Sequence, residues 1–266
     1  MTEEYESFYR FPDEKIVVTG PEFEYKLNKD GFRTKNFERL NSNTYNFLYS
    51  GCSYTFGEGI PEEYMWTNLL SNKLKGSFAK EVKDYNISKR GLSIHAIVRG
   101  VFSFCEKYGD PDLIVLFLPN IARSIHYNSE TKEYEDLCIP DTLDGVKPHR
   151  KDIQYVKSFC YEDHKLLAFD MLKFLEKYCE LKGIKLIYSS WLYRERYLYE
   201  ESDLKNHYQV NIGPHIPVDK ELAELENTNN DPYWSVARDG LHPGTFANKK
   251  VSEEFFKIII KEIGEK

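Results

Sequence analysis

The sequence predicts a three-layer α/β/α sandwich, in which helices cover both faces of a mostly parallel sheet. Strand-like and helix-like segments alternate along the chain, as they do in layered α/β domains. The run Leu113–Leu118 is continuously apolar, which is typical of a parallel strand buried on both faces. Four further segments carry apolar stripes at the 3.6-residue helical period. The length of 266 residues, with 41% hydrophobic and 30% charged residues, suits a globular chain with a real core.

Four segments are predicted to form the strands of the sheet. Each is a short apolar or alternating run bounded by polar or turn-forming residues. The fourth resembles the third in composition and follows the turn signal of Gly183. The predicted strands are Tyr45–Ser50, Val82–Ile87, Leu113–Leu118 and Ile184–Ser189.

Four helices are predicted between and after these strands. The first begins after Pro61, because the first turn of a helix tolerates a residue without an N–H group. The second extends from about Ser93 to Tyr108, the third from about Glu162 to Lys182, and the last follows Pro243. The inward positions expected on the third helix are Leu167, Met171, Phe174, Leu175 and Tyr178.

We expect a single domain over residues 1–266, with an N-terminal extension, residues 1–43, before the first core strand. Two polar, tyrosine-rich insertions cover about residues 121–160 and 192–236. Each is longer than an ordinary connection, and long loops in compact domains are commonly functional. Each follows a predicted strand, so both should leave the carboxyl edge of the sheet, where open α/β sheets bind ligands.

The charge balance excludes several classes of protein. The formal net charge of −7 and pI near 5.6 provide no basic surface for nucleic acid and disfavour an anionic membrane. No apolar run approaches the roughly 20 residues that span a bilayer. The acidic start of the chain does not resemble a signal peptide, and five dispersed cysteines are typical of reduced thiols, so a cytoplasmic location is expected. The histidines lack zinc-site spacing, and no metal is expected.

The most informative segment is YSGCSYTFGEG, residues 49–59, which leaves the first predicted strand. It lacks the lysine of a phosphate-binding GxxxxGK[ST] loop and does not match GxGxxG. It places Ser53 at a strand-to-helix turn, where a hydroxyl can be exposed as a nucleophile. A turn without chemistry is the alternative interpretation.

A second segment, RDGLHPG, lies just before the final helix at residues 238–244. Asp239 precedes His242 by three residues, so its carboxylate could fix the imidazole tautomer and stabilise the imidazolium. A helix-capping turn is the alternative for this pair.

Together the two segments resemble the SGNH hydrolases, the GDSL-type esterases and lipases, whose sandwich is flavodoxin-like. The resemblance implies a nucleophile at Ser53 and a base at His242, held by Asp239. It also implies an oxyanion hole made by the Ser53 N–H, the Gly91 N–H after the second strand and the Asn120 amide after the third. The ordered blocks cover about residues 31–262, and the upstream DGFR, residues 30–33, resembles a stretch that precedes this turn in many members.

The sequence departs from the family pattern in two places. Cys52 occupies the position of Asp in the GDSL motif that gives the family its name. Cys52 is itself an alternative nucleophile, although the family pattern favours Ser53. Asn120 keeps its place, but Pro119 and Ile121 replace the usual neighbours, so it could instead cap a turn.

The resemblance implies hydrolysis of a carboxylic ester, and by analogy with the family a short acyl group such as acetyl on a carbohydrate or other small alcohol. No organic cofactor is required. An O-acyltransferase of the same fold and a non-catalytic glycan- or protein-binding module remain alternatives. Arg123 could bind a carboxylate or phosphate of the substrate or form a surface ion pair, and Trp191 could stack on a sugar or belong to the core. The oligomeric state stays open.

Overall fold

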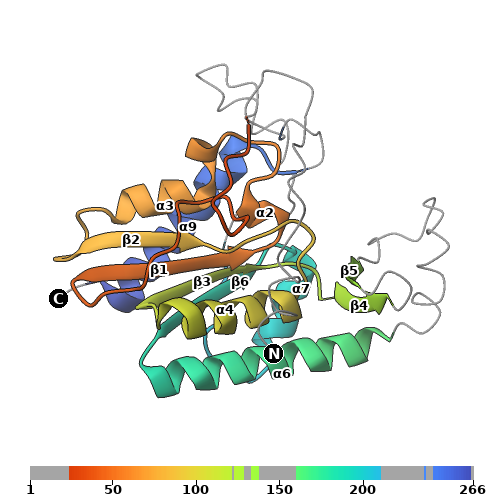
Figure 1. Ribbon diagram of the computed structural model, residues 1–266. Helices are drawn as coiled ribbons and strands as arrows, with labels where there is room; N and C mark the ends of the chain where they lie inside the picture. The colour runs from red at the N-terminus through yellow and green to blue at the C-terminus, as the bar shows by residue number, and fades with distance from the viewer. Residues whose placement is uncertain are drawn as a thin grey trace.

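The computed structural model describes residues 24–121, 123–128, 133–137, 160–210, 237 and 242–264 (Figure 1). Its centre is a four-stranded, fully parallel sheet in the order β2-β1-β3-β6. These strands are β1 (Thr44–Gly51), β2 (Glu81–Asn86), β3 (Leu113–Leu118) and β6 (Lys185–Ser190). The bounds of all four lie within one residue of those predicted. All six residues of β3 are buried, as the apolar run predicts.

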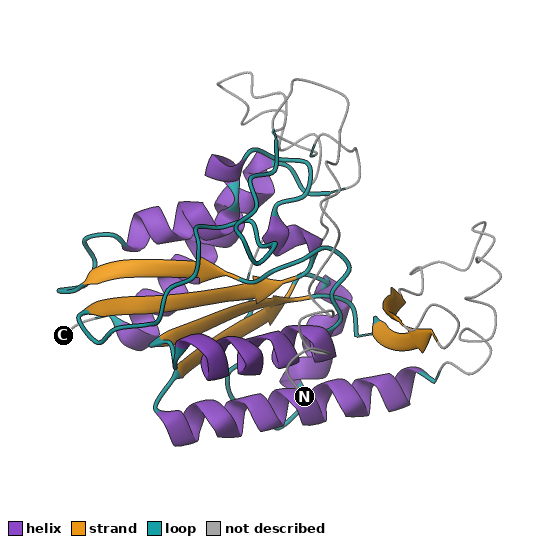
Figure 2. Cartoon of the chain, viewed as in Figure 1, coloured by secondary structure: helices purple, strands orange, loops and turns teal. Residues whose placement is uncertain are grey.

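Helices cover both faces of this sheet (Figure 2). On one face, α4 (Ile94–Tyr108) and α6 (Tyr161–Lys182) pack around a core that includes Leu48 and Ile114. On the other, α3 (Trp66–Leu74) and α9 (Thr245–Ile263) pack around Tyr49 and Val115. Successive strand residues thus point to opposite cores. The architecture confirms the predicted three-layer α/β/α sandwich.

The region after Pro61 differs from the expected single helix. A 3₁₀ helix, η1 (Glu62–Tyr64), comes first, and α3 begins only at Trp66. Met65 between them is extended, with ψ of 136°, and it is fully buried. The extended backbone at Met65 interrupts the helical path, which the apolar period alone does not reveal.

The inward face predicted for α6 is wrong at two positions. Leu167 and Phe174 are 51% and 66% exposed. The buried residues of this helix are Ala168, Phe169, Leu172, Leu175 and Cys179. Apolar residues occupy two neighbouring stripes of α6, and the sequence does not indicate which stripe faces the sheet.

Three segments lie outside this sandwich pattern. An antiparallel hairpin of β4 (Ser124–Asn128) and β5 (Glu133–Leu137) lies in the first insertion, and the short helix α7 (Tyr193–Glu200) begins the second. Residues 24–43 contain no helix or strand. Even so, this segment buries Phe32 and Phe37, and the Phe37 ring contacts Phe104 of α4 at 5.4 Å between centroids. The described part of the extension therefore contributes to the core.

The strand order creates a switch point at the carboxyl end of β1. The chain passes from β1 to β2 on one side and then to β3 on the other, so the connections diverge there. Open α/β sheets bind ligands in the crevice at such a point. Gly51 at the end of β1 pairs in register with Phe117 of β3, so the segments carrying Ser53 and Asn120 leave neighbouring strand ends. No helix in the described part of the chain is long and apolar enough to cross a membrane.

Candidate active site

The turn that carries Ser53 is formed by close backbone packing. β1 ends at Gly51, and Ser53 begins the single-turn helix α2 (Ser53–Phe56), which Gly57 closes with φ of 74°. A Cβ on residue 51 would lie 2.1 Å from Thr55 Oγ1 and 2.7 Å from Phe117 O, so only glycine allows this approach. Ser53 itself is 4% exposed.

A buried arginine holds the far end of this turn. Arg33 Nη1 donates to Gly57 O at 2.6 Å, and Arg33 Nη2 donates to Ile60 O at 2.8 Å. Its guanidinium lies over the Tyr25 ring, 4.6 Å from the centroid, which is a cation–π contact. Burial lowers the pKa of Arg33 to about 10, so the group stays charged at neutral pH. The resemblance identified Arg33 as part of a recurring stretch, but its role as a clamp on the Ser53 turn is visible only in the structure.

The structure brings His242 close to the Ser53 turn. The His242 ring meets the ring of Tyr54, the residue after Ser53, edge-on at 5.5 Å between centroids. Tyr54 also stacks on Trp191 at 4.4 Å, with 20° between the planes. Trp191 is half-buried and lies at the end of β6 beside these residues, so it borders the candidate site.

The imidazole of His242 faces a carboxylate that the sequence analysis did not select. His242 Nε2 lies 3.9 Å from Glu58 Oε2, and Glu58 Oε1 forms an ion pair with Arg90 Nη1 at 3.1 Å. Among the described residues, no hydrogen bond joins Ser53 to His242, although His242 has a further partner. Asp239, the predicted partner of His242, lies outside the described residues.

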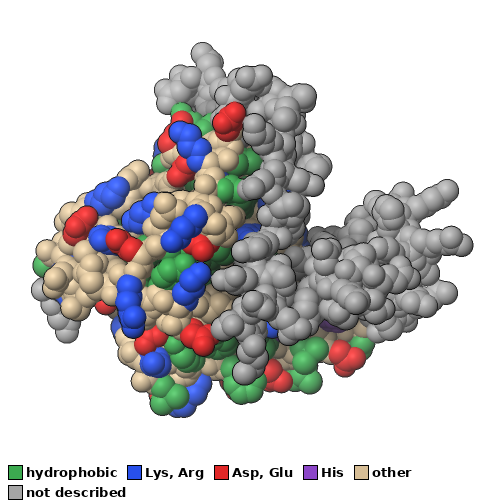
Figure 3. Space-filling model, in the orientation of Figure 1, with side chains coloured by type: hydrophobic (Ala, Val, Ile, Leu, Met, Phe, Trp, Pro, Cys, Tyr) green, Lys and Arg blue, Asp and Glu red, His purple; other side chains and the backbone are tan. Residues whose placement is uncertain are grey.

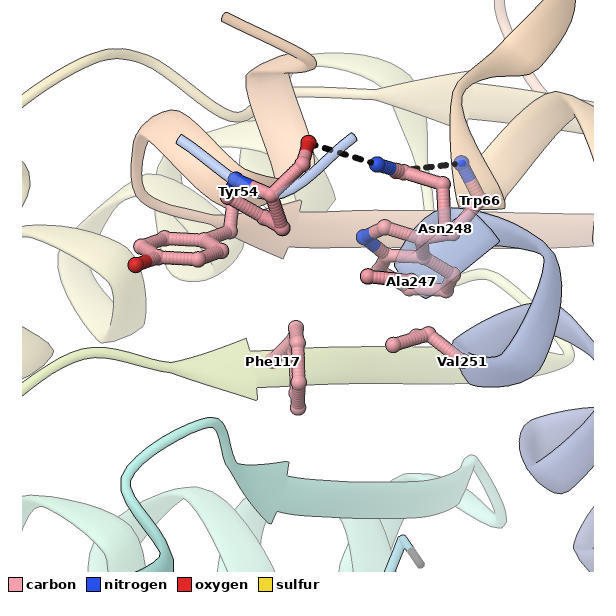
Figure 4. A pocket seen from close by; sticks show the side chains of 7 residues that line it. Tyr54, Trp66, Phe117, Ala247, Asn248 and Val251 are labelled. Carbon is pink, nitrogen blue, oxygen red and sulfur yellow. Dashed lines mark hydrogen bonds between the residues drawn. The ribbon is translucent and has the colours of Figure 1, made fainter. Parts of the chain in front are cut away.

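An amide side chain fixes the His242 loop to the opposite side of the site (Figure 4). Asn248 Nδ2 donates to Gly244 O at 2.9 Å and to Pro243 O at 3.3 Å. Its Oδ1 accepts a hydrogen bond from the Trp66 N–H at 3.0 Å, at the start of α3. The buried Asn248 amide therefore connects the two residues after His242 to the helix that follows the Ser53 turn. Sequence reasoning missed this residue, because an asparagine inside a helix carries no signal of its own.

The two other predicted oxyanion donors follow the strands on either side of β1. Gly91 lies in the β2–α4 connection with φ of 77°. Asn120 follows β3 and is buried. The loop after Asn120 is held by α7, because both carboxylate oxygens of Glu195 accept from the Ile121 N–H, at 3.2 and 3.3 Å. The same carboxyl edge of the sheet therefore carries Ser53, Gly91 and Asn120.

A buried lysine lies two residues before Gly91. Lys89 is 3% exposed, and its Nζ lies 4.5 Å from the centroid of the Phe32 ring. Burial lowers the pKa of Lys89 to about 7, and the negative charge of Asp30 opposes that shift. The β2–α4 loop is therefore packed against the segment that also supplies Arg33.

Two further features lie beside these groups. The Arg123 N–H donates to Asn120 O at 3.1 Å, which places Arg123 next to the Asn120 loop with a half-buried side chain. A small apolar pocket opens between the Ser53 turn, β3 and α9 (Figure 4). Its lining residues are Tyr54, Trp66, Phe117, Pro243, Ala247, Asn248 and Val251.

Comparison with known proteins gives structural similarities only. No protein-family model and no curated protein matches the sequence. Among solved structures, the chain is similar to a psychrotrophic esterase from Pseudoalteromonas sp., with 13% identity and a TM-score of 0.48 over 83% of this chain and 100% of that one.

It is also similar to a member of the lipolytic protein G-D-S-L family from Veillonella parvula, with 10% identity and a TM-score of 0.43 over 81% and 98% of the two chains. A third match is an acetyl xylan esterase, with 12% identity and a TM-score of 0.44 over 81% and 100%. These identities and TM-scores are too low to carry an activity over to this chain.

Proposed function

We propose that this protein is a serine hydrolase that cleaves carboxylic esters, with Ser53 as nucleophile and His242 as general base. The observation that carries the proposal is the meeting of separate segments at one edge of the sheet. Ser53, Gly91 and Asn120 follow three adjacent strands, and the His242 loop joins them from the start of α9. A nucleophile, a base and oxyanion donors within one crevice are the components that acyl transfer needs.

In the proposed mechanism, Ser53 Oγ attacks the ester carbonyl while His242 accepts the hydroxyl proton. The tetrahedral oxyanion receives hydrogen bonds from the Ser53 and Gly91 N–H groups and the Asn120 amide. His242 then returns the proton to the leaving alcohol, and water releases the acyl group by the same route. Asp239 is proposed to hold the imidazole.

The mechanism requires His242 to turn toward Ser53 when substrate binds. Catalytic hydrogen bonds are commonly long in free enzymes and shorten in the substrate complex. The 3.9 Å approach of His242 Nε2 to Glu58 describes the resting position of the ring. Entry of the substrate next to Ser53 would replace that approach with a Ser53–His242 hydrogen bond.

The surroundings support a short acyl group on a carbohydrate or small alcohol. The apolar pocket beside Tyr54 and Pro243 has room for about one water molecule, so it offers no space for a long acyl chain. The stacked pair of Tyr54 and Trp191 offers aromatic surface at the edge of the site, and such surfaces suit sugar rings. We propose that Arg123, beside Asn120, contacts a polar group of the substrate.

The same groups could pass the acyl group to a sugar hydroxyl instead of water, which would make the protein an O-acyltransferase. Product analysis with and without an added sugar acceptor separates the two reactions. A glycan-binding module without catalysis is the other alternative, and the aromatic pair is the observation that favours it. Such a module would keep its glycan affinity in the variant Ser53→Ala.

The deciding experiment is labelling with a fluorophosphonate probe followed by peptide mapping. We expect modification at Ser53 that is lost in Ser53→Ala and reduced at least about 100-fold in rate in His242→Ala. The exposed Ser42→Ala is the matched control and should label like the wild type. Cys52→Ala tests the neighbouring thiol and should also label.

A folded protein with no label at Ser53 would overturn the proposed function. A labelled protein should then hydrolyse p-nitrophenyl acetate faster than the octanoate ester, because the apolar pocket is small. The reverse preference would contradict the short-acyl assignment while leaving the serine mechanism intact.

A further inference from the structure

The outer face of α6 carries an exposed apolar stripe. Leu167, Phe174 and Leu181 are 51%, 66% and 75% exposed. They recur every seven residues, so they lie along one line of the helix. Hydrophobic side chains gather along the lower edge of the molecule over α6 (Figure 3). Exposed apolar side chains in a continuous row are typical of an interaction surface.

The spacing of this stripe matches that of a helix-pairing seam. Met171 and Tyr178 lie between the three exposed residues and are half-buried against the core. Together the five positions alternate in steps of four and three residues, which is the pattern of the a and d positions of a coiled coil. With 22 residues, α6 is about 33 Å long, which gives about two turns of contact on each side of Phe174.

The charges beside the stripe reverse sign about Phe174. Asp170 lies four residues before Phe174 and Lys177 three residues after it, and both are exposed on the same side of the stripe. Lys177 Nζ also donates to Glu180 Oε2 of the same helix at 2.9 Å, and such an exposed pair contributes little stability, so Lys177 can change partner. Two copies of α6 side by side in parallel would place like charges together. An antiparallel arrangement places Asp170 against Lys177 of the partner subunit, twice by symmetry.

We propose that two copies of this chain form a dimer by antiparallel pairing of their α6 helices. The two-fold axis passes near Phe174, which packs against Phe174 of the partner subunit. Leu167 then packs against Leu181 of the partner subunit, and the Asp170–Lys177 pairs fix the direction. A two-fold interface must be self-complementary. This stripe is self-complementary in the spacing of its apolar residues and in its charges. The proposal uses no residue of the candidate active site and does not rest on the proposed function.

The first test is the mass of the full chain in solution, measured by light scattering after size exclusion at about 50 µM. The wild type should have about twice the chain mass of 31.4 kDa. Phe174→Glu should reduce it to the mass of one chain, because a carboxylate would face its own copy across the axis. Leu166→Glu is the matched control, since Leu166 is also exposed on α6, at 62%, but lies about a quarter turn from Phe174.

The second test addresses the antiparallel direction. Asp170→Lys and Lys177→Asp should each weaken the dimer at least tenfold, because each puts like charges in contact. The double variant Asp170→Lys/Lys177→Asp should return the dissociation constant to within about threefold of the wild type.

A wild type that is monomeric overturns the proposal. A dimer that survives Phe174→Glu overturns it as well. A dimer in which the double charge reversal fails to restore affinity overturns the antiparallel arrangement.

Discussion

The Ser53 turn and the His242 loop are held in place by different chemistry. The Ser53 turn, with the neighbouring Gly91 loop, packs against two buried cations, Arg33 and Lys89. The His242 loop is tied to α3 by the neutral amide of Asn248. Burying a cation has a desolvation cost only while the group is protonated, so that cost changes with pH. The Asn248 amide does not titrate, so the free energy of its hydrogen bonds does not change in this way. The free energy contributed by the buried cations should therefore depend on pH, whereas that contributed by the Asn248 hydrogen bonds should not.

The largest effect is expected from removing the Arg33 clamp. Arg33→Met removes the guanidinium donors from Phe56 O and Ile60 O, whereas Gly57 O keeps the Ile60 N–H at 3.3 Å. Each unsatisfied acceptor costs about 1–3 kcal/mol, so we expect a loss of about 3–5 kcal/mol in the free energy of unfolding. Urea denaturation measures it. Arg39→Met, on the exposed side of the same segment, should stay within about 0.5 kcal/mol of the wild type, and an Arg33→Met loss below about 1 kcal/mol would show that the clamp is not structural.

Lys89 provides the pH-dependent test of the comparison. Its pKa is about 7 in the folded protein and about 10.4 in an unfolded chain. Below pH 7 both the folded and the unfolded state hold the proton, and the net free-energy cost of burying the Lys89 ammonium is at its largest. Between pH 7 and 10.4 the unfolded state holds more protons, so this cost falls as the pH rises. Lys89→Met should therefore stabilise the protein by on the order of 3 kcal/mol at pH 6 and by less than about 1 kcal/mol at pH 10.

Denaturation of Lys89→Met at several pH values between 6 and 10 checks this expectation. Lys73→Met, at an exposed position on α3, is the control and should change the stability little at any of these values. A gain from Lys89→Met that is the same at pH 6 and pH 10 would contradict the assignment of a buried, titrating lysine.

The smallest of the three effects is expected at the neutral clamp. Asn248→Ala removes three hydrogen bonds and should cost about 2 kcal/mol, equally at pH 6 and pH 9. Because it loosens the His242 loop, it should also slow fluorophosphonate labelling of Ser53 about tenfold in the folded protein. The control variant Asn72→Ala, at an exposed position on α3, should neither lower the stability nor slow the labelling of Ser53. A marked pH dependence of the Asn248→Ala effect would remove the contrast between the Ser53 turn and the His242 loop.

The sequence predicts the sheet well because its signals are local. The short apolar run of β3 is typical of a strand buried on both faces, and the observed bounds, Leu113–Leu118, match those predicted. The sequence fails at α6, where two apolar stripes compete and only packing shows that Ala168 and Leu172 face inward while Phe174 faces outward. The hairpin of β4 and β5 has too mixed a pattern to be recognised in advance.

Some residues of the candidate site could be predicted from the sequence and others could not. Ser53, Gly91 and Asn120 follow recognisable strands, so their convergence can be predicted from a parallel sheet with its switch point at β1. Arg33 and Asn248 act through hydrogen bonds to backbone groups far along the chain, and residue type alone does not reveal such partners. The role of Asp239 stays a prediction.

The hydrogen bond from the Trp66 N–H to Asn248 spans 182 residues of the chain. During synthesis from the N-terminus, β1, β2, β3 and α3 emerge long before α9, so the sheet edge can assemble while the His242 loop is still being translated. The ribosome must release nearly the whole chain before Asn248 reaches α3. The contact between the His242 loop and α3 therefore cannot form before residue 248 has left the ribosome.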